Sequence, residues 1–315
     1  MAGRAIAGSP ADGRRYCQQM HEIEVDRGGR VLRARDVGDP GGPVVMYFHG
    51  TPGSRLDLSS GEQDAADSGV RLISFDRPGS GGSTPAPFGL ASIAADAHAV
   101  ADALGVARFA TLGMSGGGPA ALAAATVPGG RVSRVGVASG AGPFQHVPGA
   151  LEALDDGDRA ALPSLTSDPA AAAAVFAAGF EPLAKLARDP DGPGMAAAFA
   201  DLLSPRDSEL LADRHRAAAF EQTMREALRQ GTSGGGWDNV SWIGEWDIDL
   251  GAVRCPVLLW YGDDDRFARP TFGRYLAEHL PRARLVMRAG EGHFGILEHL
   301  GEILDALTEP DPAPA

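Results

Sequence analysis

The chain has little cysteine and no long apolar run. Cys17 and Cys255 are its only cysteines among 315 residues. Two isolated cysteines form neither a disulfide framework nor a metal-binding pattern. No stretch of about 20 apolar residues is present to span a membrane, and residues 1–20 lack the apolar core of a signal peptide. We therefore expect a cytoplasmic protein that does not engage a membrane.

Positive charge is also scarce. Lys185 is the only lysine, and 41 Asp and Glu outweigh 28 Lys and Arg, for a net charge of −13. Proteins that bind nucleic acid need basic surface to replace counterions, so this balance argues against such a partner. The 44% apolar and 22% charged residues are typical of a globular protein. The length suits one large domain or a core with a sizeable insertion.

Apolar runs and helical spacings alternate from residue 43 to residue 139. The predicted strands and helices are, in chain order, 43–48, 61–69 (helix), 70–75, 90–105 (helix), 108–113, 117–127 (helix) and 131–139. This alternation is typical of a parallel sheet with helices on both faces. Two strands at 22–25 and 31–37, joined by "DRGG", should form a hairpin before it.

The alternation of predicted strands and helices stops between residues 142 and 250. This segment has no convincing buried strand, and its alanine-rich helical pieces at 168–187, 193–203 and 204–231 are broken by proline and glycine. Strands return at 255–262 and 283–288, each followed by a helix. We expect an α/β fold with a mostly parallel central sheet, helices on both faces and an inserted helical cap. The expected division is a flexible tail (1–20), a core (21–141 and 251–308), the cap (142–250) and a disordered tail (309–315).

The sequence "GMSGG", residues 113–117, ends a buried strand and opens a helix. It fits the G-x-S-x-G pattern of a nucleophile elbow, in which a sharp turn exposes the serine at the top of the sheet. Flanking glycines are needed where a Cβ atom would collide with nearby backbone. The helix start directs free N–H groups toward a developing anion. Ser115 is therefore the candidate nucleophile.

An acid and a histidine follow in the order that this elbow requires. Asp263, Asp264 and Asp265 come after the strand at 255–262, and His293 comes after the strand at 283–288. The carboxyl ends of parallel strands meet at one edge of a sheet, where such folds place their sites. A serine hydroxyl needs a base to become a good nucleophile. We therefore expect Ser115 and His293 to act together.

The turn "HGTPG" caps the strand at 43–48, where an oxyanion-binding N–H is needed. We assign this role to the backbone N–H groups of Thr51 and Gly116. The residues expected to contact a substrate are His49, Gly50, Met114, Trp237 and Phe294. Trp237, Trp242 and Trp246 could also simply pack two layers together, which is the commoner role of such aromatics.

The sequence resembles the α/β-hydrolase fold family with a helical cap. The resemblance covers about residues 21–141 and 251–308 and rests on "HGTPG", "FDRPGSGGS", "GMSGG", "YGDDD" and "GEGH". In that family the acid usually stands three residues after the glycine that ends its strand, which implies Asp265 and leaves Asp263 as the alternative. The family also implies that Asp76, Arg77 and Gly79 brace the rim of the site. The aromatic residue common in the family at the position of Ser80 is missing.

The resemblance implies a serine hydrolase that needs no metal or organic cofactor. Ser115 would attack a carboxylic ester, His293 would move the proton and Asp265 would orient the imidazole. The serine excludes relatives that use a carboxylate nucleophile, such as haloalkane dehalogenases. Because the cap is apolar, we expect a small to medium, fairly hydrophobic acyl substrate as the partner of a monomer or homodimer.

Three other functions remain open. One is a prolyl aminopeptidase-like enzyme, in which Glu181 and Glu221 could recognise a substrate amine, although solvated helix faces are the commoner fate of such residues. Another is a C–C bond hydrolase with the same triad. The third is a non-catalytic small-molecule receptor, because such proteins can keep all three residues.

Overall fold

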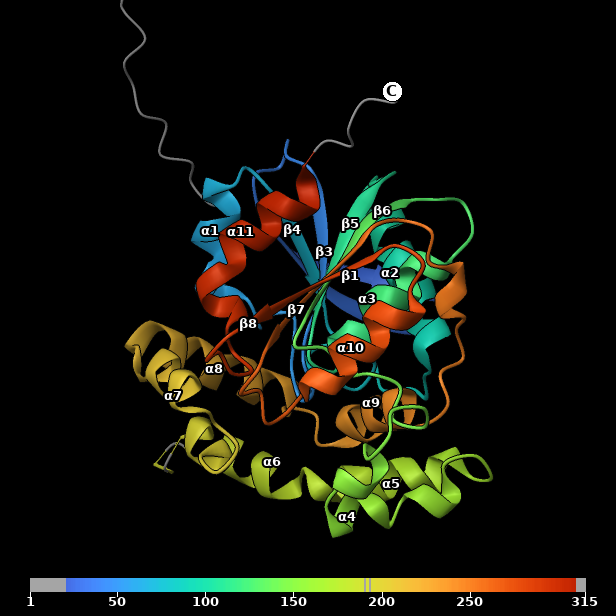
Figure 1. Ribbon diagram of the computed structural model, residues 1–315, viewed down its shortest axis with the longest axis vertical. Helices are drawn as coiled ribbons and strands as arrows, with labels where there is room; N and C mark the ends of the chain where they lie inside the picture. The colour runs from blue at the N-terminus through green and yellow to red at the C-terminus, as the bar shows by residue number, and fades with distance from the viewer. Residues whose placement is uncertain (1–20, 190, 193, 310–315) are drawn as a thin grey trace, which may run out of the picture.

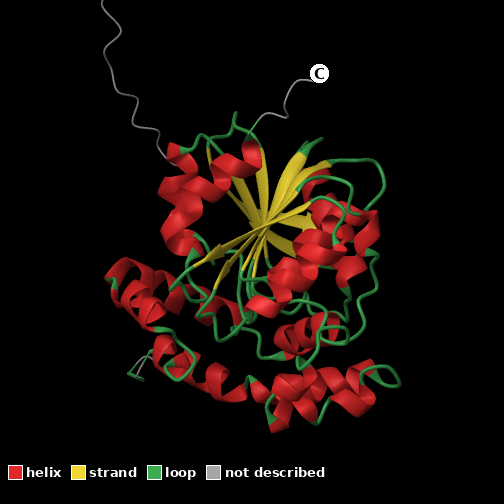
Figure 2. Cartoon of the chain, in the orientation of Figure 1, coloured by secondary structure: helices red, strands yellow, loops and turns green. Residues whose placement is uncertain are grey.

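A computed structural model describes residues 21–189, 191–192 and 194–309. The predicted tail at 1–20 lies outside the described residues, as does the tail at 309–315 apart from Glu309. Eight strands form one sheet with the order β1-β2-β4-β3-β5-β6-β7-β8 (Figures 1 and 2). The strands are β1 (His21–Asp26), β2 (Val31–Gly38), β3 (Val44–Phe48), β4 (Arg71–Phe75), β5 (Phe109–Met114), β6 (Val132–Ala138), β7 (Val257–Gly262) and β8 (Ala283–Arg288).

The sheet is parallel except at one edge. β1 pairs antiparallel with β2, and β2 pairs antiparallel with β4. From β4 to β8 all neighbours are parallel. The predicted hairpin and mostly parallel sheet are thus confirmed. The crossovers place the carboxyl ends of β3, β5, β7 and β8 at the same edge.

Helices cover both faces of this sheet, as predicted. One face carries α1 (Glu62–Asp67) and α11 (Ile296–Thr308), and the other carries α2 (Leu90–Ala103), α3 (Gly117–Thr126) and α10 (Pro270–His279) (Figure 1). The apolar spacing explains α11: Leu300, Ile303, Leu304 and Leu307 lie on one side of the helix and are buried. Each such side chain contributes about 1.5–3 kcal/mol when it is removed from water. With helices on both sides, all six residues of β5 are buried.

The chain between β6 and β7, here named the insertion, is helical wherever it is regular. Its α-helices are α4 (Asp156–Arg159), α5 (Pro169–Gly179), α6 (Glu181–Ala187), α7 (Pro205–Ala212), α8 (Arg214–Ala227) and α9 (Ser233–Ile243). They lie beyond one end of the sheet, at the bottom of Figure 1. Of the helical piece expected at 193–203, the structure describes residues 194–203, and the one helical element there is a short 3₁₀ turn, Met195–Phe199. The exact division into core and cap stays a prediction.

Sequence patterns did not predict α9, because its first turn is "SGGG" and glycine disfavours helices. The structure shows why glycine is used there. A Cβ on Gly235 would lie 2.8 Å from the Phe180 ring, and one on Gly236 would lie 2.3 Å from the carbonyl oxygen of Ala173. Tertiary packing of α9 on α5 therefore outweighs a poor local propensity.

The turn from β5 into α3 is as tight as the sequence predicts. Ser115 adopts the left-handed region with φ 53°, which is uncommon for a residue with a side chain. A Cβ on Gly117 would lie 2.1 Å from the carbonyl oxygen of Phe48, and one on Gly113 would lie 2.2 Å from that of Gly117. The helix thus starts against the backbone of β3, and only glycine allows this approach.

A buried ion pair joins the insertion to the core. Arg77, in the loop after β4, is 1% exposed, and Asp238, on α9, is also 1% exposed. Their side chains meet through two bonds, Nε to Oδ1 at 2.6 Å and Nη2 to Oδ2 at 2.7 Å. The guanidinium also donates to the carbonyl oxygens of His49 and Gly50, at 2.7 and 2.9 Å. The pair therefore fixes the loop after β3 against α9.

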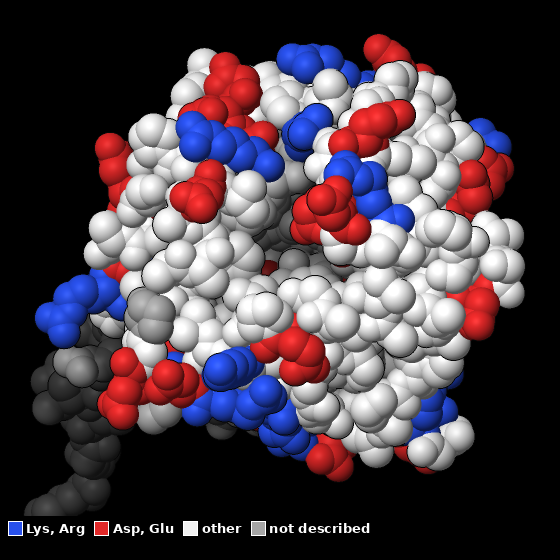
Figure 3. Space-filling model, turned by 90° about the horizontal axis from the view of Figure 1, so that it is seen from below, with Lys and Arg blue, Asp and Glu red and all other residues white. Residues whose placement is uncertain are grey.

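Among the described residues, no single helix has the length and apolarity to cross a membrane; α5 and α6 pass such a test only together, as a pair bent by 48°. On the face shown in Figure 3, acidic and basic side chains are interspersed around a central hollow. They do not gather there into a basic patch.

Gly117→Ala should destabilise the fold by about 3 kcal/mol or more, because the added methyl collides with a backbone carbonyl that cannot move away. Gly179→Ala is the matched control, since a Cβ there meets nothing within 4 Å, and it should cause no loss. Urea denaturation measures both. Equal stability of the two variants would contradict the close approach.

Asp238→Asn should lower the free energy of unfolding by about 3–5 kcal/mol, because it leaves the Arg77 guanidinium buried without its counter-charge. Asp156→Asn is the control: Asp156 pairs with Arg159, but its side chain is 97% exposed, so its loss should change little. Denaturant unfolding of both variants checks this. A small effect of Asp238→Asn would show that the pair is not an essential link.

Candidate active site

Ser115 lies at the carboxyl end of β5 and lines a pocket between the sheet edge and the insertion. The pocket and its mouth contain about 680 Å³ of space not filled by atoms. The structure brings several predicted site residues together in its wall: Gly50, Thr51, Met114, Ser115, His293 and Phe294. They come from the ends of β3 and β5 and from the loop after β8. Parallel pairing at one sheet edge thus assembles residues that are far apart in the chain.

Asp265 lies next to His293. The Nδ1 atom of the His293 ring is 2.9 Å from Oδ2 of Asp265 and 3.1 Å from Oδ1. Oδ1 also accepts the backbone N–H groups of Phe267 and Ala268, both at 2.9 Å. Because a carboxylate only accepts, Nδ1 carries the proton and Nε2 is left as the basic nitrogen. The arrangement therefore fixes the position and tautomer of the ring.

The other two aspartates of "GDDD" do not reach His293. Asp263 accepts the backbone N–H of Gly290 at 2.7 Å, and Asp264 lies beside Arg266. Of the two alternatives from the sequence, Asp265 is therefore the one in contact with His293. Asp263 instead fastens the turn after β8.

The charges around His293 favour its protonated form. Burial by itself lowers the pKa of His293, but the charge and hydrogen bond of Asp265 raise it, and the charges of Asp207 and Asp57 add to this. The net result is a pKa above the ordinary 6.5. The Phe267 ring lies 4.8 Å from the imidazole, centroid to centroid. His293 is thus a buried imidazole whose basicity is increased by neighbouring carboxylates.

The Ser115 hydroxyl forms no hydrogen bond with His293 or any other group in the described part of the chain, although the two residues line one pocket. Such bonds are often long before a substrate binds. The backbone places Ser115 firmly: its N–H donates to Ala138 at 3.1 Å, and its carbonyl accepts from Gly118 and Ala141, both at 3.0 Å.

The loop after β3 is turned so that the Thr51 N–H faces away from Arg77. In a planar trans peptide, the C=O and the following N–H point in opposite directions. The Gly50 carbonyl is held by Arg77, so the Thr51 N–H in the same peptide points the other way. Neither this N–H nor that of Gly116 has a protein acceptor within the described residues. A Cβ on Gly116 would lie 2.3 Å from Oγ1 of Thr51, so the two residues are in contact.

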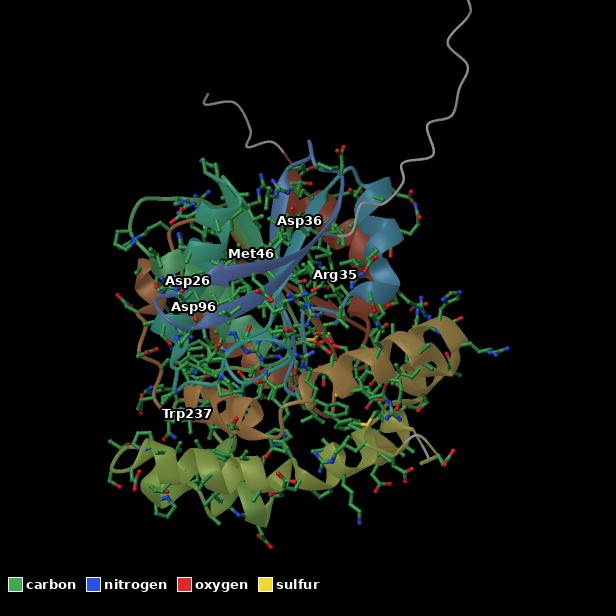
Figure 4. All side chains as sticks on the ribbon, turned by 180° about the vertical axis from the view of Figure 1, so that it is seen from behind. Asp26, Arg35, Asp36, Met46, Asp96 and Trp237 are labelled. Atoms are coloured by element: carbon green, nitrogen blue, oxygen red, sulfur yellow. The ribbon has the colours of Figure 1, made fainter. Side chains whose placement is uncertain are left out.

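His49 and Trp237 do not line the pocket. The His49 ring is buried, with Nδ1 2.8 Å from the Gly50 carbonyl and Nε2 accepting the Arg77 N–H at 3.2 Å. Burial lowers the pKa of His49, and the Arg77 charge lowers it further, so the ring is a neutral support for the loop. Trp237 packs on the hydrophobic core where α9 meets the other insertion helices (Figure 4). Contact with core side chains leaves Trp237 only partly exposed.

The loop "FDRPGSGGS" lies behind the site. Asp76 is fully buried and accepts the backbone N–H groups of Arg55 and Gly82, both at 2.7 Å. The Arg55 guanidinium pairs with it at 2.7 Å. Ser80, where the family often has an aromatic residue, is buried close to Gly234 on α9 and does not line the pocket.

The sequence did not single out most of the residues that line the pocket, which come both from the insertion and from the core around the sheet edge. Phe199, Phe220, Phe267 and Phe294 form a chain of rings with neighbouring centroids 5.6–6.1 Å apart. The further lining residues that it did not single out include Pro52, Asp57, Ser60, Arg216, Ala219, Met224 and Leu297. No local motif marks these positions as pocket residues, because their convergence depends on how the insertion packs against the core.

Asp57 is the acidic residue in this wall. Its Oδ2 accepts the Tyr47 hydroxyl at 2.7 Å and the Gly50 N–H at 3.1 Å. Burial raises the pKa of Asp57, while these hydrogen bonds and the charges of Arg77 and His293 oppose that rise. Asp57 therefore occupies the Gly50 N–H and leaves the next amide, that of Thr51, for another acceptor.

Glu181 and Glu221 are engaged elsewhere. Glu181 accepts the Thr232 hydroxyl at 2.9 Å. Glu221 accepts the Met195 N–H at 2.8 Å and pairs with Arg225 at 2.6 Å. Neither lines the pocket. Within the described residues, no group of three His, Cys, Asp or Glu side chains is arranged to hold a metal ion.

Solved structures resemble this one over almost its whole length. A hydrolase from Pseudomonas aeruginosa has 19% sequence identity and a TM-score of 0.64, covering 93% of this chain and 99% of its own. An esterase from a Rhodococcus species has 21% identity and a TM-score of 0.63, covering 92% and 98%. An enol-lactonase from Burkholderia xenovorans has 19% identity and a TM-score of 0.62, covering 90% and 99%. At these identities the likeness shows the fold.

No protein of curated function matches the sequence. The family described as the alpha/beta hydrolase fold matches residues 43–300, which includes most of the sheet, the insertion and all the residues around the pocket. Strand order, elbow and sequence match agree: the chain belongs to the α/β-hydrolase fold family.

Proposed function

We propose that the protein is a serine hydrolase that cleaves a small to medium carboxylic ester through an acyl-enzyme on Ser115. One observation carries this proposal. Ser115, held in the left-handed conformation at the elbow, lines the same pocket as a histidine whose Nδ1 is bonded to a buried aspartate. A serine hydroxyl becomes a good nucleophile when a base takes its proton and a third group orients that base. Here His293 lines the pocket with Ser115, and Asp265 contacts the Nδ1 side of the His293 ring.

In the proposed reaction, Oγ of Ser115 attacks the acyl carbonyl while Nε2 of His293 takes the hydroxyl proton. The bond to the alcohol then breaks, and His293 returns the proton to the leaving oxygen. Water attacks the acyl-enzyme next, giving its proton to His293. The acid leaves, and the proton returns to Ser115. Asp265 stays ionised and stabilises the imidazolium in both steps.

The oxyanion of each tetrahedral intermediate would be bound by the backbone N–H groups of Thr51 and Gly116. Both are without protein acceptors in the described chain, and the Gly116 N–H stands at the start of α3, where the helix dipole favours negative charge. Each donor in such a site accelerates the reaction by about 10²–10³-fold. The contact between the two residues supports a single shared binding point.

The composition of the pocket wall favours a substrate with an apolar acyl group. Four phenylalanines, two methionines and Leu297 line it, against two charged side chains of opposite sign, Asp57 and Arg216. Aromatic rings bury large apolar areas and position a ligand at low entropic cost. The aminopeptidase alternative has less support, because Glu181 and Glu221 do not reach the pocket.

Ser115→Ala should reduce kcat for p-nitrophenyl esters by about 10⁴–10⁶-fold, because nothing replaces the nucleophile. The esters should run from acetate to octanoate, so that the profile of the wild type measures the length of the pocket. Ser68→Ala, at the end of α1 and outside the pocket, is the control and should match the wild type. Binding without turnover by the wild type would instead support a receptor.

The value of kcat/KM should rise with pH and level off, with a midpoint above 6.5. His293 must be neutral to accept a proton, and its pKa lies above that ordinary value, so the enzyme loses activity as pH falls through the raised pKa. A profile from pH 5 to 9 measures the midpoint. A midpoint below 6.5, or a flat profile, would contradict the assignment of His293 as the base.

A further inference from the structure

A carboxylate from the insertion lies directly under the loop that carries His293. Asp207, in the first turn of α7, is 0% exposed. Its Oδ2 accepts the backbone N–H of His293 at 3.0 Å, and its Oδ1 accepts that of Phe294 at 2.8 Å. The partners are 86 and 87 residues apart in the chain. This contact is separate from the one between Asp265 and the imidazole ring.

The same carboxylate is held in place from the insertion side. Ser204, the N-cap of α7, donates to Oδ2 of Asp207 through its N–H at 3.1 Å and its hydroxyl at 2.9 Å. The Asp207 N–H is bonded to the Ser204 hydroxyl at 3.0 Å. No ion pair of Asp207 occurs in the described chain. A buried carboxylate without a cation is costly unless several donors satisfy it, and here the donors come from both sides.

The His293 loop packs on Asp207 without a gap. A Cβ on Gly292 would lie 2.0 Å from Oδ2 of Asp207 and 2.2 Å from Oγ of Ser204. A residue with a side chain at position 292 would therefore push the loop off the carboxylate. The absence of a side chain at Gly292 and the buried acid at Asp207 form one complementary contact.

We propose that Asp207 is a positioning residue for His293, holding the backbone of the His293 loop so that the imidazole stays between Asp265 and Ser115. This inference rests on the proposed function. It makes the insertion part of the catalytic framework, since α7 supplies the group that fixes the base.

A positioning role through a charged group differs from simple structural support. The groups that face His293 are Asp265 after β7, Asp57 after β3 and Asp207 on α7, while Arg216 on α8 lines the same pocket. The Asp207 charge contributes to the raised pKa of His293. Loss of that charge should lower this pKa, and loss of the two hydrogen bonds should loosen the ring. Misplacement of a catalytic group by about 1 Å can cost about 10²-fold in rate.

The test compares Asp207→Asn with Ser204→Ala. Asparagine keeps the shape but has no charge, and only one of its two terminal atoms can accept an N–H. Ser204→Ala removes the hydroxyl that caps α7 and keeps the carboxylate. Both variants should lose stability, because both disturb the start of α7. The His293 pKa is read from an NMR titration of its imidazole, assigned with His293→Gln, and kcat is measured on a p-nitrophenyl ester.

We expect Asp207→Asn to lower the His293 pKa and to reduce kcat by about 10–100-fold. Ser204→Ala keeps the carboxylate, so it should not lower the His293 pKa. Gly292→Ala is a second, independent variant that separates the loop from an intact carboxylate; it should reduce kcat as well, and it decides the matter if Asp207→Asn does not fold. If Asp207→Asn folds and both its His293 pKa and its kcat are unchanged, the proposal is overturned. If Asp207→Asn does not fold, an unchanged His293 pKa and kcat in Gly292→Ala would overturn it.

The two proposals fail in different ways. A wild type that hydrolyses no ester, but whose His293 pKa falls in Asp207→Asn, would overturn the proposed ester hydrolysis and keep the link between Asp207 and His293. A wild type that hydrolyses esters, with the His293 pKa and kcat unchanged in Asp207→Asn, would keep the proposed ester hydrolysis and overturn the link between Asp207 and His293.

Discussion

The hydrogen bonds from Arg77 to the loop after β3 are the constraint on which the rest of the site depends. A guanidinium presents its donors in a fixed plane, and here that plane serves Asp238 on one side and two successive carbonyl oxygens, those of His49 and Gly50, on the other. Fixing each carbonyl also fixes the N–H of the same peptide in the opposite direction. The first such N–H, that of Gly50, is taken by Asp57. The second, that of Thr51, has no acceptor within the described residues and lies beside Gly116, where we propose that the oxyanion binds.

The insertion contributes more than a wall to this arrangement. Two of its helices each place a buried carboxylate against a loop at the sheet edge: Asp238 of α9 behind the loop after β3, and Asp207 of α7 behind the loop after β8. The first acts through Arg77 and also accepts the Thr51 hydroxyl at 2.9 Å, and the second accepts backbone N–H groups directly. Between these two loops, Ser115 is held by the glycine-lined turn of β5 into α3. Groups from both parts of the chain therefore set the relative positions of Ser115, His293 and the N–H groups of Thr51 and Gly116. The geometry of the site thus depends on how the insertion packs on the core.

The sheet could be predicted from sequence because a buried parallel strand leaves a local mark, a continuous apolar run between turn residues. The elbow at Ser115 was predictable for a similar reason, since only glycine fits beside it. Other features depend on distant contacts. The helix α9 begins with glycines that disfavour it locally and is explained by its packing on α5. Asp57 belongs to no motif. Asp207 stands in the capping box of α7 with Ser204, but its partners in the His293 loop are more than 80 residues away, and no local pattern indicates that contact. For Trp237 the sequence left open both a ligand contact and packing between layers, the commoner role, and the residue packs on the core.

The most direct test of this account is a crystal structure of the protein after reaction with an alkyl fluorophosphonate, whose phosphorus is attacked by an activated serine and whose oxygen then imitates the oxyanion. We expect a covalent bond from Oγ of Ser115 to phosphorus, with the phosphoryl oxygen about 3 Å from the backbone nitrogens of both Thr51 and Gly116 and the alkyl group among the phenylalanines. An adduct whose oxygen lies away from these two nitrogens, or a protein that forms no bond at Ser115, would contradict it.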